Sequence, residues 1–244
     1  MMVFSGINPV AFSLGPLDVH WYGIMYLLGF ISAWALARWR IWYFKLPWTP
    51  ELLSDLIFYA ALGVVVGGRI GYMLFYNLHT LLQAPWVVFR VWEGGMSFHG
   101  GFLGVLIALM LFARVHHRSF WGVADFVAPL VPLGLAAGRL GNFINGELWG
   151  RPTEMPWGMV FPAVDNQPRH PSQLYEMGLE GFLLFTLVWW YARKPRPEGM
   201  VSAVFLMGYA LLRSCAECWR EPDAGVGFLA GGWLTEGQLL SLPL

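Results

Sequence analysis

The residues best suited to chemistry lie between Gly138 and Gly150, where an arginine, two asparagines and a glutamate stand among glycines, directly after a long apolar run. A charged side chain within a membrane-spanning segment costs about 3 kcal/mol even on lenient insertion scales, so it usually faces the bundle interior and has a partner. Arg139, Asn142 and Glu147 are therefore candidate site residues. The glycines around them let the backbone approach a ligand closely.

Two further arginines, Arg69 and Arg213, lie within other apolar segments, at a depth that we expect to match that of Arg139 in the outer leaflet. Guanidinium groups bind phosphate through two parallel hydrogen bonds and stay charged at any relevant pH. The sequence therefore predicts a site for an anionic lipid headgroup. His20 and His99 precede apolar segments at the same level, and His99 is a candidate proton acceptor.

A structural interpretation of these residues stays open beside the functional one. In the last apolar segment, a single helix face is predicted to carry Tyr209, Arg213, Glu217 and Arg220. Arg213 and Glu217 can form a purely structural i,i+4 ion pair, and Arg69 can tie helices together through backbone carbonyls. A lone histidine is ordinarily a satisfied polar residue.

The composition is that of an integral membrane protein. Hydrophobic residues make up 57% of the 244 and charged residues 12%, against about 25% charged in soluble domains, and the mean hydropathy is +0.53. The formal net charge of zero suggests no nucleic-acid partner. Cys215 and Cys218 are read as small apolar residues on a helix. With no metalloprotease, serine-hydrolase or P-loop motif, we expect no metal and no cofactor.

Apolar segments predict an all-α, polytopic transmembrane helix bundle that forms one integral membrane domain over residues 1–244. Six stretches are long enough, or nearly so, to span: Trp21 to Ala37, Leu56 to Tyr76, Phe98 to Ala113, Trp121 to Leu140, Leu174 to Ala192, and Met200 to Cys218.

The connections alternate in charge, which predicts the orientation of the bundle. The basic ones hold Arg38, Arg40 and Lys45, then Arg114 and Arg118, then Arg193, Lys194 and Arg196. The positive-inside rule places them in the cytoplasm, so both termini face outward. The polar segment of residues 142–173, between the fourth and fifth helices, is expected to form a small extracytoplasmic cap.

Several sequence blocks together resemble one family. The blocks are His20 to Gly23, Gly67 to Tyr72, Gly94 to Gly101, Gly138 to Gly150, Arg169 to Glu176, and Arg220 to Asp223. They resemble the signature blocks of bacterial prolipoprotein diacylglyceryl transferase along nearly the whole chain. The resemblance implies a multi-pass enzyme of the bacterial inner membrane, with its active site toward the periplasmic leaflet. It would transfer the diacylglyceryl group of phosphatidylglycerol to the lipobox cysteine thiol of a prolipoprotein signal peptide, forming a thioether and releasing glycerol phosphate.

The resemblance also implies roles for individual residues. Arg139 and Arg213 match the arginines around the lipid phosphate, and His99 matches the histidine proposed to take the thiol proton. Tyr22 and Tyr209 match site tyrosines, and Glu147 and Glu217 match acidic partners of the arginines. The remaining expected substrate-binding residues are His20, Arg69, Asn142, Gly150 and His170.

The chain departs from the family at two places. The outer segment from Trp157 to Pro168 is shorter than in some members, and Glu236 to Leu244 is too short to cross a bilayer where the family begins a seventh spanning helix. We therefore expect that helix to be absent. A transporter or flippase of an anionic lipid, or a non-catalytic lipid-binding scaffold, remains an alternative, because such proteins also place arginines inside the bundle.

Overall fold

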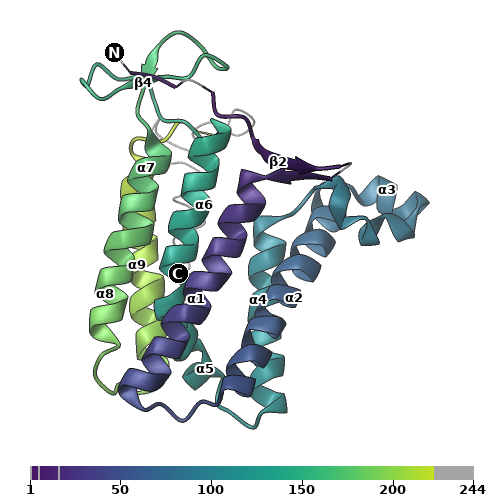
Figure 1. Cartoon of the computed structure of the whole chain (residues 1–244), viewed down its shortest axis with the longest axis vertical. Coiled ribbons are helices and arrows are strands. Elements are labelled where there is room, and N and C mark those ends of the chain that lie inside the picture. The colour runs from purple at the N-terminus through teal and green to yellow at the C-terminus, as the bar shows by residue number, and fades with distance from the viewer. Residues whose placement is uncertain (1, 5, 16, 223–244) are drawn as a thin grey trace. The chain divides into compact units, whose positions relative to one another are not determined.

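The computed structural model describes residues 2–4, 6–15 and 17–222, and most of this chain is helical, as the sequence predicts (Figure 1). The helices of at least 15 residues are α1 (Trp21–Phe44), α2 (Pro50–Phe75), α4 (Phe98–Val115), α6 (Val131–Asn145) and α9 (Met200–Glu217). The shorter α-helices are α3 (Leu78–Gln83), α5 (Phe120–Val127), α7 (Ser172–Glu176) and α8 (Leu184–Tyr191). Three 3₁₀ helices, η1 (Pro85–Phe89), η2 (Val91–Glu93) and η3 (Ala128–Leu130), and the π-helical segment η4 (Met177–Leu183) complete the set.

Five helical segments of the described chain are long and apolar enough to cross a membrane, one fewer than predicted. They are Trp21–Phe44, Pro50–Phe75, Phe98–Val115, Phe120–Asn145 and Met200–Glu217. The exception is the predicted span Leu174 to Ala192. There the helix is divided into α7, η4 and α8, because a π-helical turn interrupts the α-helical hydrogen bonding. The helical membrane bundle is confirmed, with five candidate spans among the described residues where six spanning helices are predicted.

The chain forms two compact units. The first unit runs up to Leu36 and resumes at Asp125, and the second unit is Ala37–Ala124. The expectation of a single membrane domain over residues 1–244 stays a prediction. The expected lack of a seventh helix concerns Glu236 to Leu244, which lie outside the described residues, as does Asp223 of the last sequence block.

In the second unit, α2 and α4 pack along much of their length, side by side in Figure 1. Their contact is lined by glycines, and a Cβ on Gly67 would collide with the backbone of Gly100 and Gly104. Small residues allow helix backbones to approach closely in membranes. Both helices also begin on an N-cap hydroxyl: Thr49 accepts from the N–H of Leu52, and Ser97 from that of Gly100, each at 3.2 Å.

In the first unit, α6, η4, α8 and α9 pack around a core that includes the fully buried side chains of Leu184 and Val188. Asp125 joins this bundle at one end. Its carboxylate accepts from the N–H of Gly199 and of Ser202, both at 2.8 Å, at the start of α9. A carboxylate at a helix N-terminus satisfies N–H groups that the helix leaves unpaired, so it fixes where α9 begins.

The cap, residues 142–173, comprises the last turn of α6, the start of α7 and the connection between them, which lies beyond the helix ends and holds β4 and β5 (Figure 1). Its extracytoplasmic placement stays a prediction. β4 (Met159–Val160) pairs in parallel with β1 (Met2–Val3) and antiparallel with β5 (Pro168–Arg169). A separate antiparallel hairpin, β2 (Val10–Leu14) with β3 (Leu17–His20), leads into α1. The cap is thus held to the N-terminal residues by backbone hydrogen bonds.

Candidate active site

Arg139 on α6 lies against two glutamates of the neighbouring helical segment. Its Nε and Nη2 donate to Glu180 Oε2 at 3.2 and 2.9 Å, and its Nη1 lies 3.2 Å from Glu176 Oε2. Both carboxylates are fully buried, whereas the Arg139 side chain keeps 16% of its surface exposed. The two segments come this close because Gly181 packs on Ala136, where a Cβ would collide. Arg139 is therefore held in place and remains partly accessible.

Arg213 on α9 binds the same two glutamates from another helix. Its Nη1 lies 2.7 Å from Glu176 Oε1, 3.6 Å from Glu180 Oε1 and 2.7 Å from Glu217 Oε2. The contact with Glu217 is the i,i+4 ion pair that the spacing indicates. Glu176 thus bridges the two arginines, one through each of its oxygens, so α6, α7 and α9 converge on one carboxylate.

Six groups form this buried network, which we call the Arg–Glu cluster: Arg139, Arg213, Arg220, Glu176, Glu180 and Glu217. Arg220 joins at its edge, with Nη1 3.8 Å from Glu217 Oε2. With all six ionised, the formal charges cancel. Replacing a buried ion pair by apolar groups is often neutral or stabilising, so such a cluster is weak evidence for a stabilising role. The cluster fixes the positions of the Arg139 and Arg213 guanidinium groups, which have N–H groups that can donate to an anion.

Glu176 and Glu180 are the cluster members that sequence reasoning misses as site residues. The sequence does indicate that both acids are functional or paired, because they stand four residues apart in a segment that is otherwise almost entirely apolar. An isolated acid in such a segment predicts a basic partner on a neighbouring helix. Which arginine it meets depends on how the helices pack, and the sequence does not specify that.

Glu147 pairs with amides and not with an arginine. Its Oε1 accepts from Asn142 Nδ2 at 3.2 Å and from Asn145 Nδ2 at 3.1 Å. Gly146, with φ of 67°, ends α6 in the left-handed conformation, so the chain turns and Glu147 reaches back to the last turn of the helix. Among the described residues it makes no ion pair, and the prediction that Glu147 is an arginine's acidic partner is wrong. Asn142 is buried, and this contact orients its amide.

Two other backbone segments pass very close to Gly150. Its N–H donates to the carbonyl of His170 at 2.9 Å, and a Cβ would collide with the carbonyl oxygens of His170 and Trp219. Next to it, Arg151 Nε donates to the carbonyl of Arg220 at 2.9 Å. The cap is thereby fastened to the end of α9, beside the Arg–Glu cluster, and the lack of a side chain at Gly150 makes this packing possible.

Polar pairs also hold the cap together. His170 Nδ1 lies 3.1 Å from the hydroxyl of Tyr175, which accepts from Trp157 Nε1 at 2.7 Å. Partial burial lowers the pKa of His170 below its usual value. Arg169 Nη2 donates to Asp165 Oδ2 at 2.7 Å, and this hydrogen bond lowers the pKa of the Asp165 carboxyl. His170 therefore serves as a neutral hydrogen-bonding group near pH 7.

The tyrosines predicted for the site both belong to the first unit. The Tyr22 ring packs where Gly141 of α6 has no side chain, and it meets Tyr26 edge-on with centroids 5.1 Å apart. Tyr209 of α9 stands four residues before Arg213, on the same helix face, and packs against the buried core that includes Leu184. His20, at the end of β3, is exposed, and its Nδ1 lies 3.2 Å from the carbonyl of Asp18.

Arg69 and His99 belong to the second unit. His99 is exposed in the first turn of α4, and its ring meets Phe98 edge-on with centroids 5.7 Å apart. Among the described residues of that unit, no carboxylate lies within ion-pair distance of its imidazole. It is therefore available as a proton acceptor.

Arg69 is buried, and its guanidinium is committed to backbone. It donates to the carbonyl of Val87 at 2.7 Å, of Val88 at 3.2 Å and of Gly95 at 3.3 Å, and also to that of Gly94. These carbonyls belong to the connection between α2 and α4. The geometry favours the structural interpretation of Arg69, in which it ties parts of the protein together through carbonyls.

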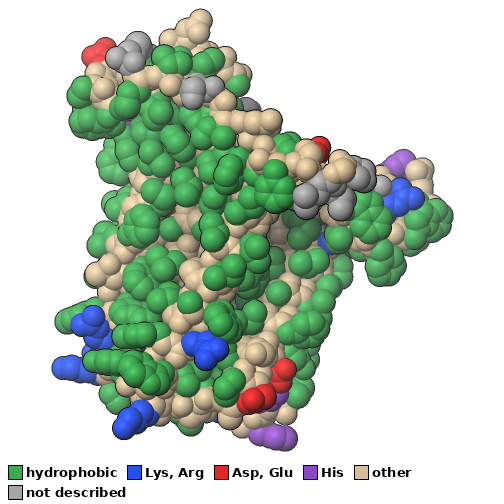
Figure 2. Space-filling model, in the orientation of Figure 1, with side chains coloured by type: hydrophobic (Ala, Val, Ile, Leu, Met, Phe, Trp, Pro, Cys, Tyr) green, Lys and Arg blue, Asp and Glu red, His purple; other side chains and the backbone are tan. Residues whose placement is uncertain are grey.

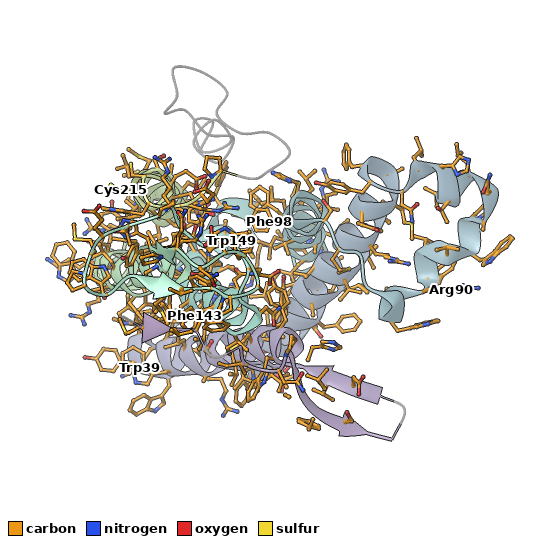
Figure 3. The ribbon with its side chains drawn as sticks, turned by 90° about the horizontal axis from the view of Figure 1, so that it is seen from above. Trp39, Arg90, Phe98, Phe143, Trp149 and Cys215 are labelled. Atoms are coloured by element: carbon orange, nitrogen blue, oxygen red, sulfur yellow. The ribbon has the colours of Figure 1, made fainter. Side chains whose placement is uncertain are left out.

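In the described ranges, no three or more His, Cys, Asp or Glu side chains are grouped so that they could hold a metal ion. Cys215 on α9 and Cys218 just after its end are exposed and form no disulfide, and Cys215 stands at the outer edge of the unit in Figure 3. Neither thiol belongs to the Arg–Glu cluster, although Glu217 lies between them in sequence. The structure therefore gives them no part in the site.

Apolar spanning helices around a buried cluster of arginines and glutamates, with a polar cap beyond the helix ends, define an α-helical integral membrane protein that has a polar site within its bundle. Residues 9–244 match the family model described as prolipoprotein diacylglyceryl transferase, and the chain belongs to this family. A phosphatidylglycerol–prolipoprotein diacylglyceryl transferase of Legionella pneumophila (strain Lens) is 66% identical over 244 residues, which cover 100% of this chain and 95% of the relative. One from Coxiella burnetii (strain RSA 331 / Henzerling II) is 58% identical over 100% of this chain and 94% of the relative.

Proposed function

We propose that this chain transfers the diacylglyceryl group of phosphatidylglycerol to the cysteine thiol of a prolipoprotein lipobox, the first step of bacterial lipoprotein maturation. The observation that carries the proposal is the high identity, over the full chain, to proteins named as this transferase. The Arg–Glu cluster supports it, because two guanidinium groups inside the bundle suit a phosphodiester. Both substrates reach the enzyme from the membrane.

The enzyme lies in the bacterial inner membrane, with its site toward the periplasmic leaflet. Support comes from the charges of the connections, because the basic ones follow α1, α4 and α8 and leave the cap on the opposite side. A prolipoprotein exported with its signal peptide in the membrane presents its lipobox cysteine near that leaflet. The cap, residues 142–173, then lies where the peptide approaches.

The reaction is a displacement at a glycerol carbon. The sulfur forms a bond to that carbon while the carbon–oxygen bond to the phosphate breaks, and the electron pair of that bond stays on the departing oxygen. The thiol proton goes to a base, and the phosphodiester monoanion becomes a phosphomonoester with a second negative charge. Catalysis therefore requires a proton acceptor for the thiol and cations around the phosphate.

Arg139 and Arg213 supply the cations. Each is oriented by carboxylates, and Arg139 keeps part of its surface exposed, so its remaining N–H groups can donate to phosphate oxygens. The added charge on the departing oxygen strengthens these hydrogen bonds in the transition state. Losing one such preorganised donor typically costs about 10²- to 10³-fold in rate.

His99 takes the thiol proton, and Tyr22, Tyr209 and Asn142 add neutral donors to the lipid. The exposure of His99, and the lack of a carboxylate partner for it among the described residues of its own unit, support this role. General-base assistance is typically worth about 10²- to 10⁴-fold. The remaining predicted substrate-binding residues position the backbone or the Arg–Glu cluster of the site. These residues are His20, Arg69, Gly150, Glu147, Glu217 and His170.

The direct test is to incubate the purified protein with phosphatidylglycerol vesicles and a lipobox peptide, and to search by mass spectrometry for the diacylglyceryl adduct on cysteine. A serine-for-cysteine peptide is the matched control, because it lacks only the nucleophile. Glycerol phosphate should appear in equal amount with the adduct. Lipid movement between leaflets without an adduct would instead support the transporter alternative, to which the names of the relatives lend no support.

A further inference from the structure

Residues 77–93 of the second unit, which we call the arm, expose large hydrophobic side chains to an unusual degree. Leu82 is 74% exposed, Trp86 60%, Phe89 76% and Trp92 76%. The arm comprises α3, η1 and η2 and extends sideways from the ends of α2 and α4 (Figure 1). Figure 3 shows the same extension from above, with Arg90 near its far side. Aromatic groups of this size in water would be costly, so the arm needs an apolar partner.

The arm is amphipathic. Large hydrophobic residues recur every three or four positions along the arm, at Leu78, Leu82, Trp86, Phe89 and Trp92, although non-helical backbone at Ala84 and Arg90 separates its three short helices. In Figure 2, hydrophobic side chains gather along the lower edge of the arm, the side toward which α2 and α4 run, and histidine and basic atoms lie along its upper edge. An apolar edge beneath a polar edge is the pattern of a segment lying in a membrane interface.

The lipid-facing surface of the spanning helices continues directly into this edge. On the last turns of α2, Leu74 is 48% and Phe75 73% exposed, and Tyr76 is 69% exposed where the arm begins. On α4, Leu103 is 53% exposed. The arm joins the end of α2 to the start of α4, so it must lie at the level where both helices leave the hydrocarbon core. Tryptophan is enriched at that level.

The backbone of the arm is satisfied internally, as a segment at membrane depth requires. The N–H groups of Ala84, Val87 and Arg90 donate to carbonyls three or four residues earlier, at 2.8, 3.0 and 3.1 Å. Arg69 of α2 donates to the carbonyls of Val87 and Val88 in the arm and to those of Gly94 and Gly95 just after it. A buried guanidinium that donates to several carbonyls acts as a clamp, and this clamp fixes the arm to α2.

We infer that the arm is an interfacial membrane anchor, which inserts its hydrophobic edge among the headgroups and upper acyl chains of the bilayer and is held there by Arg69. The partner is the lipid surface itself and not a second protein. This anchor does not depend on the transferase activity, so it can be tested apart from it.

The test places a single environment-sensitive probe on the arm. In a Cys215→Ala/Cys218→Ala background, Phe89→Cys is labelled with a nitrobenzoxadiazole dye, and the whole protein is reconstituted in phosphatidylethanolamine–phosphatidylglycerol vesicles. Quenching by a spin label at carbon 5 of the lipid chain is compared with quenching by aqueous iodide. Glu154→Cys, exposed in the cap, is the matched reference for a water-facing position. Leu82→Cys provides a second probe site if labelling at position 89 disturbs η1.

The ratio of lipid to iodide quenching should be at least about ten-fold higher at position 89 than at position 154, as for a side chain in the interface. In an Arg69→Gln variant the ratio at position 89 should fall severalfold, because the clamp is lost. Iodide quenching at position 89 equal to that at position 154 would overturn the inference. Protection of position 89 from both quenchers would also overturn it, because a protein surface, such as a second copy of the chain, would then cover the arm.

Discussion

Arg139 and Glu180 are joined through two guanidinium nitrogens and one carboxylate oxygen, with Nε at 3.2 Å and Nη2 at 2.9 Å from Glu180 Oε2. This pair orients the guanidinium plane while leaving part of Arg139 exposed. Glu180 itself is fully buried and is shielded from any direct contact with lipid. Its contribution to the reaction would be made through Arg139, as a positioning residue.

Glu180→Gln should therefore lower kcat/KM by about 10- to 100-fold, because a hydrogen bond to a charged group contributes about 1.5 to 3 kcal/mol. The amide keeps the shape of the side chain but cannot pair with two nitrogens as an anion. The assay uses phosphatidylglycerol and a lipobox peptide, with Glu154→Gln, an exposed glutamate of the cap, as the control. If the rate fell no further in Glu180→Gln than in the control, Glu180 would be structural only.

Arg139→Lys should lose about 2.7 to 4 kcal/mol of transition-state stabilisation, or about 10²- to 10³-fold in kcat, and Arg139→Ala should be no better. Lysine keeps the charge but offers a compact ammonium, which cannot pair with Glu180 and a phosphate in the planar geometry of a guanidinium. Kinetics of both variants are measured after folding in the membrane is verified. Near-normal turnover by the lysine variant would transfer the phosphate role to Arg213.

Gly150→Ala should destabilise the cap by about 1 to 3 kcal/mol, the usual cost of overpacking. The new methyl group would collide with the carbonyl oxygens of His170 and Trp219. Thermal unfolding in detergent and protease sensitivity of the cap provide the measurements. Gly23→Ala, where a Cβ meets no atom within 4 Å, is the matched control and should leave both unchanged.

The Asp165–Arg169 pair should make cap stability depend on acid pH. Its hydrogen bond lowers the pKa of Asp165, so the folded cap binds a proton less readily than the unfolded one. The stabilisation is complete above the unfolded pKa, about 3.9, and is lost as the pH falls through the folded value. Protease cleavage within the cap should thus increase below about pH 4 in the parent protein. Asp165→Asn should show faster cleavage already at pH 6, with a weaker dependence on acid.

Replacing Cys215 and Cys218 by alanine should leave turnover within a few-fold of the parent, because both thiols are exposed and outside the Arg–Glu cluster. The same assay, with folding verified by size-exclusion chromatography, measures this. Inactive but folded protein would reveal a thiol function. This double variant is also the background for the probe experiment on the arm.

The long apolar segments are sufficient to predict the helical membrane fold, because burial in lipid depends on composition along each segment. The spacing of Arg213 and Glu217 likewise predicted their pairing, since both lie on one helix. Contacts between helices are harder to predict from the sequence. The sequence predicts an arginine partner for Glu147, which pairs with Asn142, and it does not predict that Glu176 bridges Arg139 and Arg213. Such contacts depend on how helices are rotated against one another, which a single sequence does not encode locally.

The π-helical segment η4 sets the rotation of α8 relative to α7. Successive residues of an α-helix are about 100° apart around its axis, so one residue more or less turns everything beyond it by that angle. With η4 in place, Glu176 meets Arg139 and Arg213 while Leu184 and Val188 are fully buried in the core. A continuous α-helix over this stretch would present Leu184 and Val188 in other directions relative to Glu176 than those they take here. The interrupted helix thus lets one chain segment serve two partners whose directions differ.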